Sequence, residues 1–259
     1  MYRCIVPIIL IGFFICTILF LGCVSNKQDE LSVFAAVSLK DALTEIGAGF
    51  TDKHKVKIYY SFGASTTLQR QIEKGASVDI YISASSHQIY ELQQEGLIET
   101  TTRQDLLTNK LVVVSHKDSI LLINNLNDLT DRKITKIAIG QPGIVPAGTY
   151  TKEAFTQQNL WDKIHSKLIF GNNVRSTLAF VASRNVDLGI VYQTDVVISN
   201  NIKVILDIPP ETHSKIRYPA AVIRNTTHKQ LAEVFISYLR SKDASDIFDR
   251  YGFTTLTSK

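Results

Sequence analysis

An α/β fold is predicted from the alternation of strand-like and helix-like patterns along the chain. Hydrophobic runs such as 110–114 and 137–139 are short, continuous and bounded by turn residues, which is typical of buried parallel strands. Stretches with apolar residues at three- and four-residue spacing lie between such runs and predict helices. About 236 residues remain beyond an N-terminal leader, enough for one large α/β domain or for two lobes of ordinary size.

The first element of the chain is an export signal. Arg3 precedes an apolar run, 5–21, which ends at Gly22-Cys23 and gives way to polar residues. A small residue directly before a Cys is the layout of a lipoprotein signal, so we expect residues 1–22 to be removed and Cys23 to become the lipidated first residue. The apolar run is also close to the length that spans a bilayer, and an uncleaved N-terminal anchor is the alternative. Both interpretations place the protein outside the cell membrane and tethered to it.

Two helix starts in the first part of the chain carry hydroxyl side chains. A strand-like run, 31–35, passes through Ser38 into an amphipathic helix, and Ser38 is interpreted as the N-cap of that helix. An alternating strand, 56–60, is followed by Ser65 at the start of another helix, which should stop at Gly75.

Three further positions in the second part of the chain resemble these. Ala147 lies between a Pro and a Gly where a helix begins, which lets an anion approach the exposed backbone N–H groups closely. Asn172-Asn173 follows a strand-like run and should cap a helix that begins near Val174. Tyr192 ends the apolar strand 188–191.

Together these positions predict an anion-binding site. Each residue alone is also what an ordinary helix cap or strand end requires. Four helix N-termini, at roughly half an elementary charge each, would nevertheless offset the charge of a buried dianion, mainly through local N–H donation. Anions in open α/β sheets bind beyond the carboxyl ends of strands, where all of these positions lie.

The chain resembles the periplasmic molybdate-binding proteins of bacterial molybdate ABC importers, from about Leu31 to Phe253. The segments that carry the resemblance are Phe34-Ala35-Ala36-Val37-Ser38-Leu39, Ser65-Thr66-Thr67-Leu68, 76–84, 102–107, Val145-Pro146-Ala147-Gly148, Val174-Arg175, Leu188-Gly189-Ile190-Val191-Tyr192, Tyr218-Pro219 and Arg250-Tyr251-Gly252-Phe253. The resemblance implies the type II periplasmic binding protein fold, in which two α/β lobes are joined by two crossover segments and have a ligand cleft between them.

The resemblance also implies the ligand contacts. In that family, hydroxyl and backbone N–H groups at two Ser positions of the first lobe, and at an Ala, a Val and a Tyr of the second, hold the oxyanion. These positions fall on Ser38, Ser65, Ala147, Val174 and Tyr192. Molybdenum would be held only through its oxygens, so we expect neither a direct metal ligand nor a cofactor, and molybdate or tungstate as the bound ligand.

Domain boundaries follow from the same resemblance. Residues 1–22 form the predicted signal peptide and 23–30 a lipidated tether. Lobe 1 is predicted to comprise residues 31–110 and 219–259, and lobe 2 residues 111–218, with crossings near 109–112 and 217–221.

The expected function is that of a monomeric substrate-binding lipoprotein, on the outer face of the cell membrane or in the periplasm. It would deliver molybdate or tungstate to an ABC permease driven by a cytoplasmic ATPase. The net charge of +4 is spread without a basic run, so no nucleic-acid partner is predicted. The alternatives are a binding protein for another tetrahedral oxyanion, such as sulfate or phosphate, or a surface-tethered enzyme that uses the same cleft.

Catalytic and metal sites find little support in the sequence. The six His residues show no pair at metal-ligand spacing, and neither a nucleophile elbow nor a phosphate-binding loop with its Lys is present. Asp79, Asp187 and Asp195 follow or end apolar stretches, where a hydrolase could place carboxylates, but each is interpreted as a turn or cap residue. The protein is therefore not expected to be an enzyme.

Overall fold

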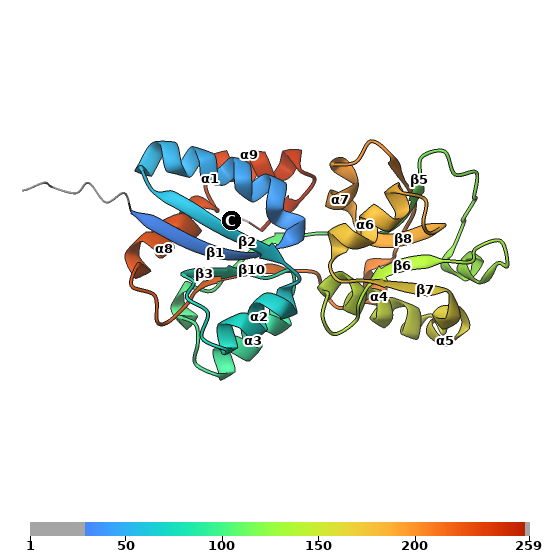
Figure 1. The fold of residues 1–259 in the computed structure, drawn as a ribbon, viewed down its shortest axis with the longest axis horizontal. Helices are drawn as coiled ribbons and strands as arrows, with labels where there is room; N and C mark the ends of the chain where they lie inside the picture. The colour runs from blue at the N-terminus through green and yellow to red at the C-terminus, as the bar shows by residue number, and fades with distance from the viewer. Residues whose placement is uncertain (1–28, 257–259) are drawn as a thin grey trace, which may run out of the picture.

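Two α/β lobes, each built on its own sheet, make up residues 29–256, the part of the chain that the computed structural model describes (Figure 1). The predicted signal peptide, 1–22, and Cys23 lie outside the described residues. Within 29–256, no helix has the length and apolar character needed to cross a membrane. The α/β class predicted from the sequence is confirmed.

Lobe 1 contains a six-stranded sheet with the strand order β11-β4-β10-β3-β1-β2. β1 runs parallel to β2 and β3, whereas β10 is antiparallel to β3 and β4. The strands are β1 (Glu30–Ala36), β2 (Lys57–Gly63), β3 (Ile80–Ile82), β4 (Gln104–Thr108), β10 (Tyr218–Val222) and β11 (Thr254–Thr255). The helices and 3-10 turns are η1 (Val37–Leu39), α1 (Lys40–His54), α2 (Ser65–Glu73), α3 (Ser86–Gln94), η2 (Thr100–Thr102), α8 (Lys229–Tyr238) and α9 (Lys242–Arg250).

Lobe 2 contains a five-stranded sheet with the order β7-β6-β8-β5-β9. The strands are β5 (Leu111–His116), β6 (Ile137–Gly140), β7 (Leu168–Gly171), β8 (Leu188–Tyr192) and β9 (Ile202–Asp207). The helices and 3-10 turns are η3 (Leu126–Thr130), α4 (Pro146–Gln157), α5 (Trp161–Ile164), η4 (His165–Lys167), α6 (Val174–Ala182), α7 (Gln193–Val197) and η5 (Pro210–Thr212).

One strand direction predicted from the sequence is wrong. The run 110–114 was expected to be a parallel strand, but β5 is antiparallel to both of its neighbours, β8 and β9. The chain enters lobe 2 through Asn109 and Lys110, beside the carboxyl end of β8, and therefore runs in the opposite direction to that strand. Val112, Val113 and Val114 are fully buried in the interior of the sheet. Their hydrophobicity therefore predicts a buried strand, but it does not indicate whether the strand is parallel or antiparallel to its neighbours.

The two sheets share one arrangement. In lobe 1 the parallel strands β2, β1 and β3 are followed by antiparallel β10, and in lobe 2 the parallel strands β7, β6 and β8 are followed by antiparallel β5. The carboxyl ends of parallel strands meet at one edge of a sheet, where open α/β sheets bind ligands. The segments after β1 and β2 in lobe 1, and after β6, β7 and β8 in lobe 2, therefore begin at equivalent edges, and η1 of lobe 1 lies against α6 of lobe 2.

Two aspartates occupy matching places at the opposite edge of each sheet. Asp79 precedes β3 and accepts hydrogen bonds from the backbone N (2.6 Å) and Oγ (2.9 Å) of Ser32 in β1. Asp187 precedes β8 and accepts from the backbone N (2.7 Å) and Oγ1 (2.9 Å) of Thr135, just before β6. Each carboxylate thus ties together the starts of two parallel strands, and this long-range role differs from the local turn or cap role predicted for both.

Candidate anion-binding site

A small cavity at the contact between the lobes is lined by all five residues predicted to bind the ligand. Its volume is about 10 Å³, against about 620 Å³ for a larger pocket beside it. The complete lining is Ala36, Val37, Ser38, Gly63, Ala64, Ser65, Ala84, Val145, Pro146, Ala147, Val174 and Tyr192. The first seven residues belong to lobe 1 and the last five to lobe 2, so the cavity exists only when the lobes are together.

Ser38 does not cap α1, contrary to the prediction. The chain first makes a 3-10 turn, η1, so α1 begins at Lys40 and its N-cap position is Leu39, which has no side-chain cap. The Ser38 Oγ instead lies 3.2 Å from the hydroxyl oxygen of Tyr218, which accepts a hydrogen bond from Asn109 Nδ2 (3.2 Å). Because Asn109 supplies a proton to the Tyr218 oxygen, the Tyr218 proton can go to Ser38, and the Ser38 proton stays available for a ligand.

Ser65 is the first residue of α2, and its position is fixed by two bonds. Its Oγ accepts a hydrogen bond from the backbone N of Ala84 (3.0 Å), and its carbonyl oxygen accepts one from the Tyr81 hydroxyl (2.8 Å). The hydroxyl proton of Ser65 is therefore free to be donated into the cavity. The helix ends as predicted before Gly75, which has a φ of +84°.

Ala147 is presented by a close contact between α4 and β6. Pro146 is the first residue of α4, where a missing N–H costs nothing, and Ala147 follows it fully buried. A Cβ atom on Gly148 would lie 1.9 Å from the carbonyl oxygen of Gly140. Only glycine therefore allows the start of this helix to approach the end of β6 so closely.

Val174 begins α6, and the predicted Asn cap is confirmed. The Asn173 Oδ1 accepts the backbone N–H of Ser176 (2.9 Å). This cap uses the donor of the third helical residue, so the N–H groups of Val174 and Arg175 are the first-turn donors that remain for a ligand.

Tyr192 lies at the end of β8 with its phenol in the cavity. The side chain is fully buried, and its hydroxyl has no hydrogen-bond partner among residues 29–256. Burial, reinforced by Tyr218, raises its pKa well above the ordinary value of 10, so the group is a neutral O–H donor at physiological pH. A buried hydroxyl without a partner is costly, which is expected where a ligand completes the bonding.

The cavity offers neutral donors and no charged side chain. Three hydroxyls from Ser38, Ser65 and Tyr192 line it together with the N-termini of α2, α4 and α6, and its lining contains no Lys, Arg, His, Asp, Glu or Cys. Backbone N–H groups at helix N-termini favour negative charge. The arrangement can therefore bind an anion, and it lacks the general base that a nucleophilic Ser requires.

Four residues of the surroundings were missed as site residues by the sequence analysis. Tyr218 and Asn109 orient Ser38, as described above. Arg175 forms an ion pair with the buried Asp195, with 2.9 Å between Nε and Oδ1, and Asp195 Oδ2 accepts the backbone N–H of Tyr192 (3.2 Å). Tyr218 and Arg175 stand in segments that carry the family resemblance, and that was the available signal. The cap role predicted for Asp195 is confirmed, but its ion pair was not foreseen.

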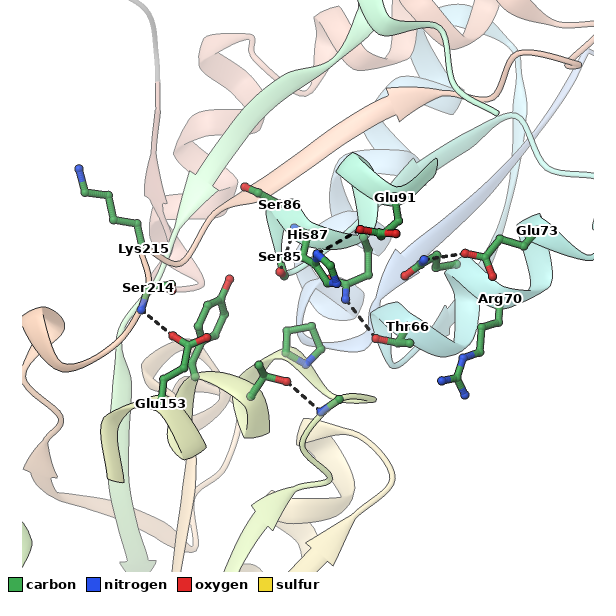
Figure 2. A pocket seen from close by; sticks show the side chains of 16 residues that line it. Thr66, Arg70, Glu73, Ser85, Ser86, His87, Glu91, Glu153, Ser214 and Lys215 are labelled. Carbon is green, nitrogen blue, oxygen red and sulfur yellow. Dashed lines mark hydrogen bonds and ion pairs between the residues drawn. The ribbon is translucent and has the colours of Figure 1, made fainter. Parts of the chain in front are cut away.

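The larger pocket is the outer part of the cleft between the lobes. Figure 2 shows Thr66 and His87 from α2 and α3 on one side and Glu153 and Ser214 from lobe 2 on the other. Acidic and basic side chains are mixed here, and the Ser214 backbone N donates to Glu153 Oε2 (2.7 Å). None of the five predicted ligand residues lines this pocket, although Pro146 lines both spaces. It is therefore interpreted as the entrance and not as the site itself.

Comparison with known proteins shows which family the chain resembles over most of its length. The family model for bacterial extracellular solute-binding proteins matches residues 31–254. The molybdate-binding protein of Escherichia coli (strain K12) is 38% identical over 231 residues, covering 88% of this chain and 90% of that protein. A Bacillus subtilis (strain 168) protein, provisionally named an ABC transporter substrate-binding lipoprotein, is 36% identical over 241 residues, covering 90% and 92%. The structure of the Azotobacter vinelandii periplasmic molybdate-binding protein superposes with a TM-score of 0.80 at 24% identity, covering 88% of this chain and 100% of that one, and confirms the fold.

Proposed function

Because this chain belongs to the bacterial extracellular solute-binding protein family, we propose that it captures molybdate or tungstate in the small cavity and delivers the anion to the permease of an ABC importer. The observation that carries the proposal is the set of neutral donors, from both lobes, around a cavity with no charged side chain. The similarity to proteins named as molybdate-binding, over most of the chain, supports the choice of anion.

Ser38, Ser65, Ala147, Val174 and Tyr192 are the proposed ligand residues. The three hydroxyls would donate to the oxyanion oxygens, and the N–H groups at the starts of α2, α4 and α6 would complete the shell. Neutral donors suit an importer, because a fixed cationic clamp would bind common anions indiscriminately and release its cargo slowly when the lobes part.

Selectivity would come from the size of the cavity. Molybdate and tungstate have longer metal–oxygen bonds than the S–O or P–O bonds of sulfate and phosphate. A rigid ring of donors spaced for the larger tetrahedron leaves the smaller one with incomplete hydrogen bonds. Sulfate or phosphate binding remains the second candidate, since both are tetrahedral oxyanions.

The remaining parts of the proposal concern location and partners. The layout at Gly22-Cys23 supports a lipid anchor at Cys23, and the Bacillus subtilis relative is named as a lipoprotein. A monomer on the outer face of the membrane would pass the anion to the permease, which a cytoplasmic ATPase drives. We propose no catalytic activity, because no base lines the cavity beside Ser38 or Ser65.

Calorimetric titration with molybdate, tungstate, sulfate and phosphate in turn tests the proposal. One-to-one binding of molybdate and tungstate, with no heat from sulfate or phosphate, is the expected result. Scattering should show a smaller radius of gyration on adding the bound anion, since the site residues come from both lobes. Binding of sulfate in preference to molybdate would replace the proposed ligand by the second candidate. The absence of binding heat with all four anions would reject oxyanion binding.

A further inference from the structure

The guanidinium of Arg175 bridges the two lobes beside the cavity. Arg175 is the second residue of α6 in lobe 2, and its Nη2 lies 2.7 Å from Asp41 Oδ2 on α1 of lobe 1. The same nitrogen donates to the carbonyl oxygen of Ser38 (3.4 Å), and the Nε lies 2.9 Å from Asp195 Oδ1 in lobe 2. One planar group thus contacts carboxylates of both lobes and the backbone of a proposed ligand residue.

A cation at this position requires an explanation. Positive charge near a helix N-terminus is unfavourable, and α6 is one of the helices whose N-terminus faces the cavity. Arg175 does not line the cavity, although its neighbour Val174 does. Two carboxylates hold the guanidinium outside the cavity. It therefore does not act as a cationic clamp, which would release the bound anion slowly.

The contacts of Arg175 lead to three of the five proposed ligand residues. Val174 precedes it in the chain, the Ser38 carbonyl accepts its hydrogen bond, and Asp195 joins it to the backbone N–H of Tyr192. Asp195 is fully buried, whereas the Asp41 side chain is 38% exposed. The lobe 2 half of the bridge is therefore built into the core, and the lobe 1 half can form or break as the cleft closes or opens.

We propose that Arg175 is a positioning residue that latches the closed cleft, through Asp41 across the lobes and through Asp195 to Tyr192. The proposal rests on the proposed function, because the latch would act by slowing the release of the bound anion. Arg175 does not contact the anion itself. Closure brings Asp41 to Arg175, and the same movement sets Ser38 opposite Val174 and Tyr192.

Asp41→Asn is the first test, because it removes the lobe 1 charge without touching the cavity or the buried pair. Preloaded radioactive molybdate is exchanged against unlabelled molybdate on the full chain, and its release rate is measured. We expect release to be roughly five to ten times faster in Asp41→Asn, because the broken pair bridges the lobes only in the closed state. The ligand-free variant should melt at the same temperature as Asp52→Asn, because opening the cleft leaves the core of each lobe intact, and this separates a latch from general destabilisation.

Asp52→Asn is the matched control. Asp52 is exposed near the other end of α1, so the substitution makes the same change of net charge on the same helix. It should leave the release rate unchanged. Arg175→Lys is the second variant: lysine keeps the charge opposite Asp195 but loses the planar fork that reaches two carboxylates, and release should again be faster. Equal release rates in Asp41→Asn and Asp52→Asn would overturn the proposal.

A second measurement tests the latch without depending on which anion binds. If the wild-type protein binds none of the four oxyanions, the proposed function fails, and the latch is judged by the distance between lobes without ligand. Spin labels introduced by Ser86→Cys and Ser214→Cys report this distance across the cleft entrance. A longer mean distance in Asp41→Asn than in Asp52→Asn supports the latch, and identical distance distributions reject it.

Discussion

The Oγ of Ser38 lies 3.2 Å from the hydroxyl oxygen of Tyr218, 180 residues later in the chain, and Asn109 donates to the same Tyr218 oxygen. This contact joins η1, the turn that follows β1, to the start of β10, and Ser38 lines the cavity. We expect Tyr218→Phe to weaken anion binding roughly fivefold, or about 1 kcal/mol, because Ser38 loses the group that orients its hydroxyl. Calorimetric titration measures this change.

Tyr218 should act only through Ser38, and a double-mutant cycle tests that. In a Ser38→Ala background, Tyr218→Phe should cost no further affinity. Tyr59→Phe is the control, since it removes an exposed phenol near the start of β2 that donates to Glu30, the first residue of β1. Equal losses with and without Ser38 would show that Tyr218 has another role.

Tyr192→Phe should reduce affinity more than Tyr218→Phe does. Its hydroxyl is buried in the cavity without a partner among the described residues, so a donated bond to the charged ligand is the contact that would be lost. Hydrogen bonds to charged groups contribute about 1.5–3 kcal/mol, which predicts at least about a tenfold loss in the same titration. The melting temperature of the ligand-free variant should be no lower than that of Tyr59→Phe, because the substitution removes a buried hydroxyl that has no partner there. Unchanged affinity would remove Tyr192 from the site.

Gly148→Ala tests the packing that presents Ala147. The new Cβ would lie 1.9 Å from the Gly140 carbonyl oxygen, so α4 and β6 must move apart. We expect the free energy of unfolding to fall by about 2 kcal/mol in urea titrations, with weaker anion binding as Ala147 is displaced.

Gly49→Ala is the control for that substitution and should have the opposite effect. Gly49 lies inside α1, where an added Cβ would meet only the far end of the Tyr238 side chain, at 3.1 Å from its hydroxyl oxygen. Alanine in a helix interior should stabilise the protein by about 0.5 kcal/mol or more. A stable Gly148→Ala protein with normal affinity would show that the close approach is not required.

The sequence predicted which segments meet at the cavity, because each one is a local pattern. Strands followed by small or hydroxyl residues and then by amphipathic helices can be recognised within about a dozen residues. The family resemblance then selected five residues within these segments, and all five line one cavity. Asn173 was identified as a cap in this way, since a cap bond spans only three residues.

Features that depend on distant parts of the chain could not be predicted in this way. The Ser38–Tyr218 contact and the Arg175–Asp41 pair join residues 180 and 134 positions apart, and no local pattern reports them. The direction of β5 was also wrong, because burial on both faces gives the same continuous hydrophobic run in parallel and antiparallel strands. Ser38 was misassigned as a cap because a 3-10 turn delays the start of α1 to Lys40.

Asp79 gives the protein a predictable dependence of stability on pH. Burial alone would raise its pKa, but hydrogen bonds from Ser32, Thr226 and His228 outweigh burial and hold the pKa below its ordinary value of 3.8. A carboxylate with a lowered pKa contributes stability above the pKa of the unfolded chain, and this contribution is lost as the pH falls through the folded pKa. Asp79→Asn should therefore lower the free energy of unfolding by about 2 kcal/mol at pH 7.

The difference between wild type and Asp79→Asn should stay constant down to about pH 5 and shrink below about pH 4, as the wild-type carboxylate is protonated. Urea unfolding across this range measures it. Asp52→Asn is the control, since this exposed carboxylate forms no ion pair or side-chain hydrogen bond within residues 29–256 and should show no such difference. A gap that persists unchanged at pH 3 would mean that the Asp79 side chain stabilises the lobe through its shape and hydrogen bonds and not through its charge.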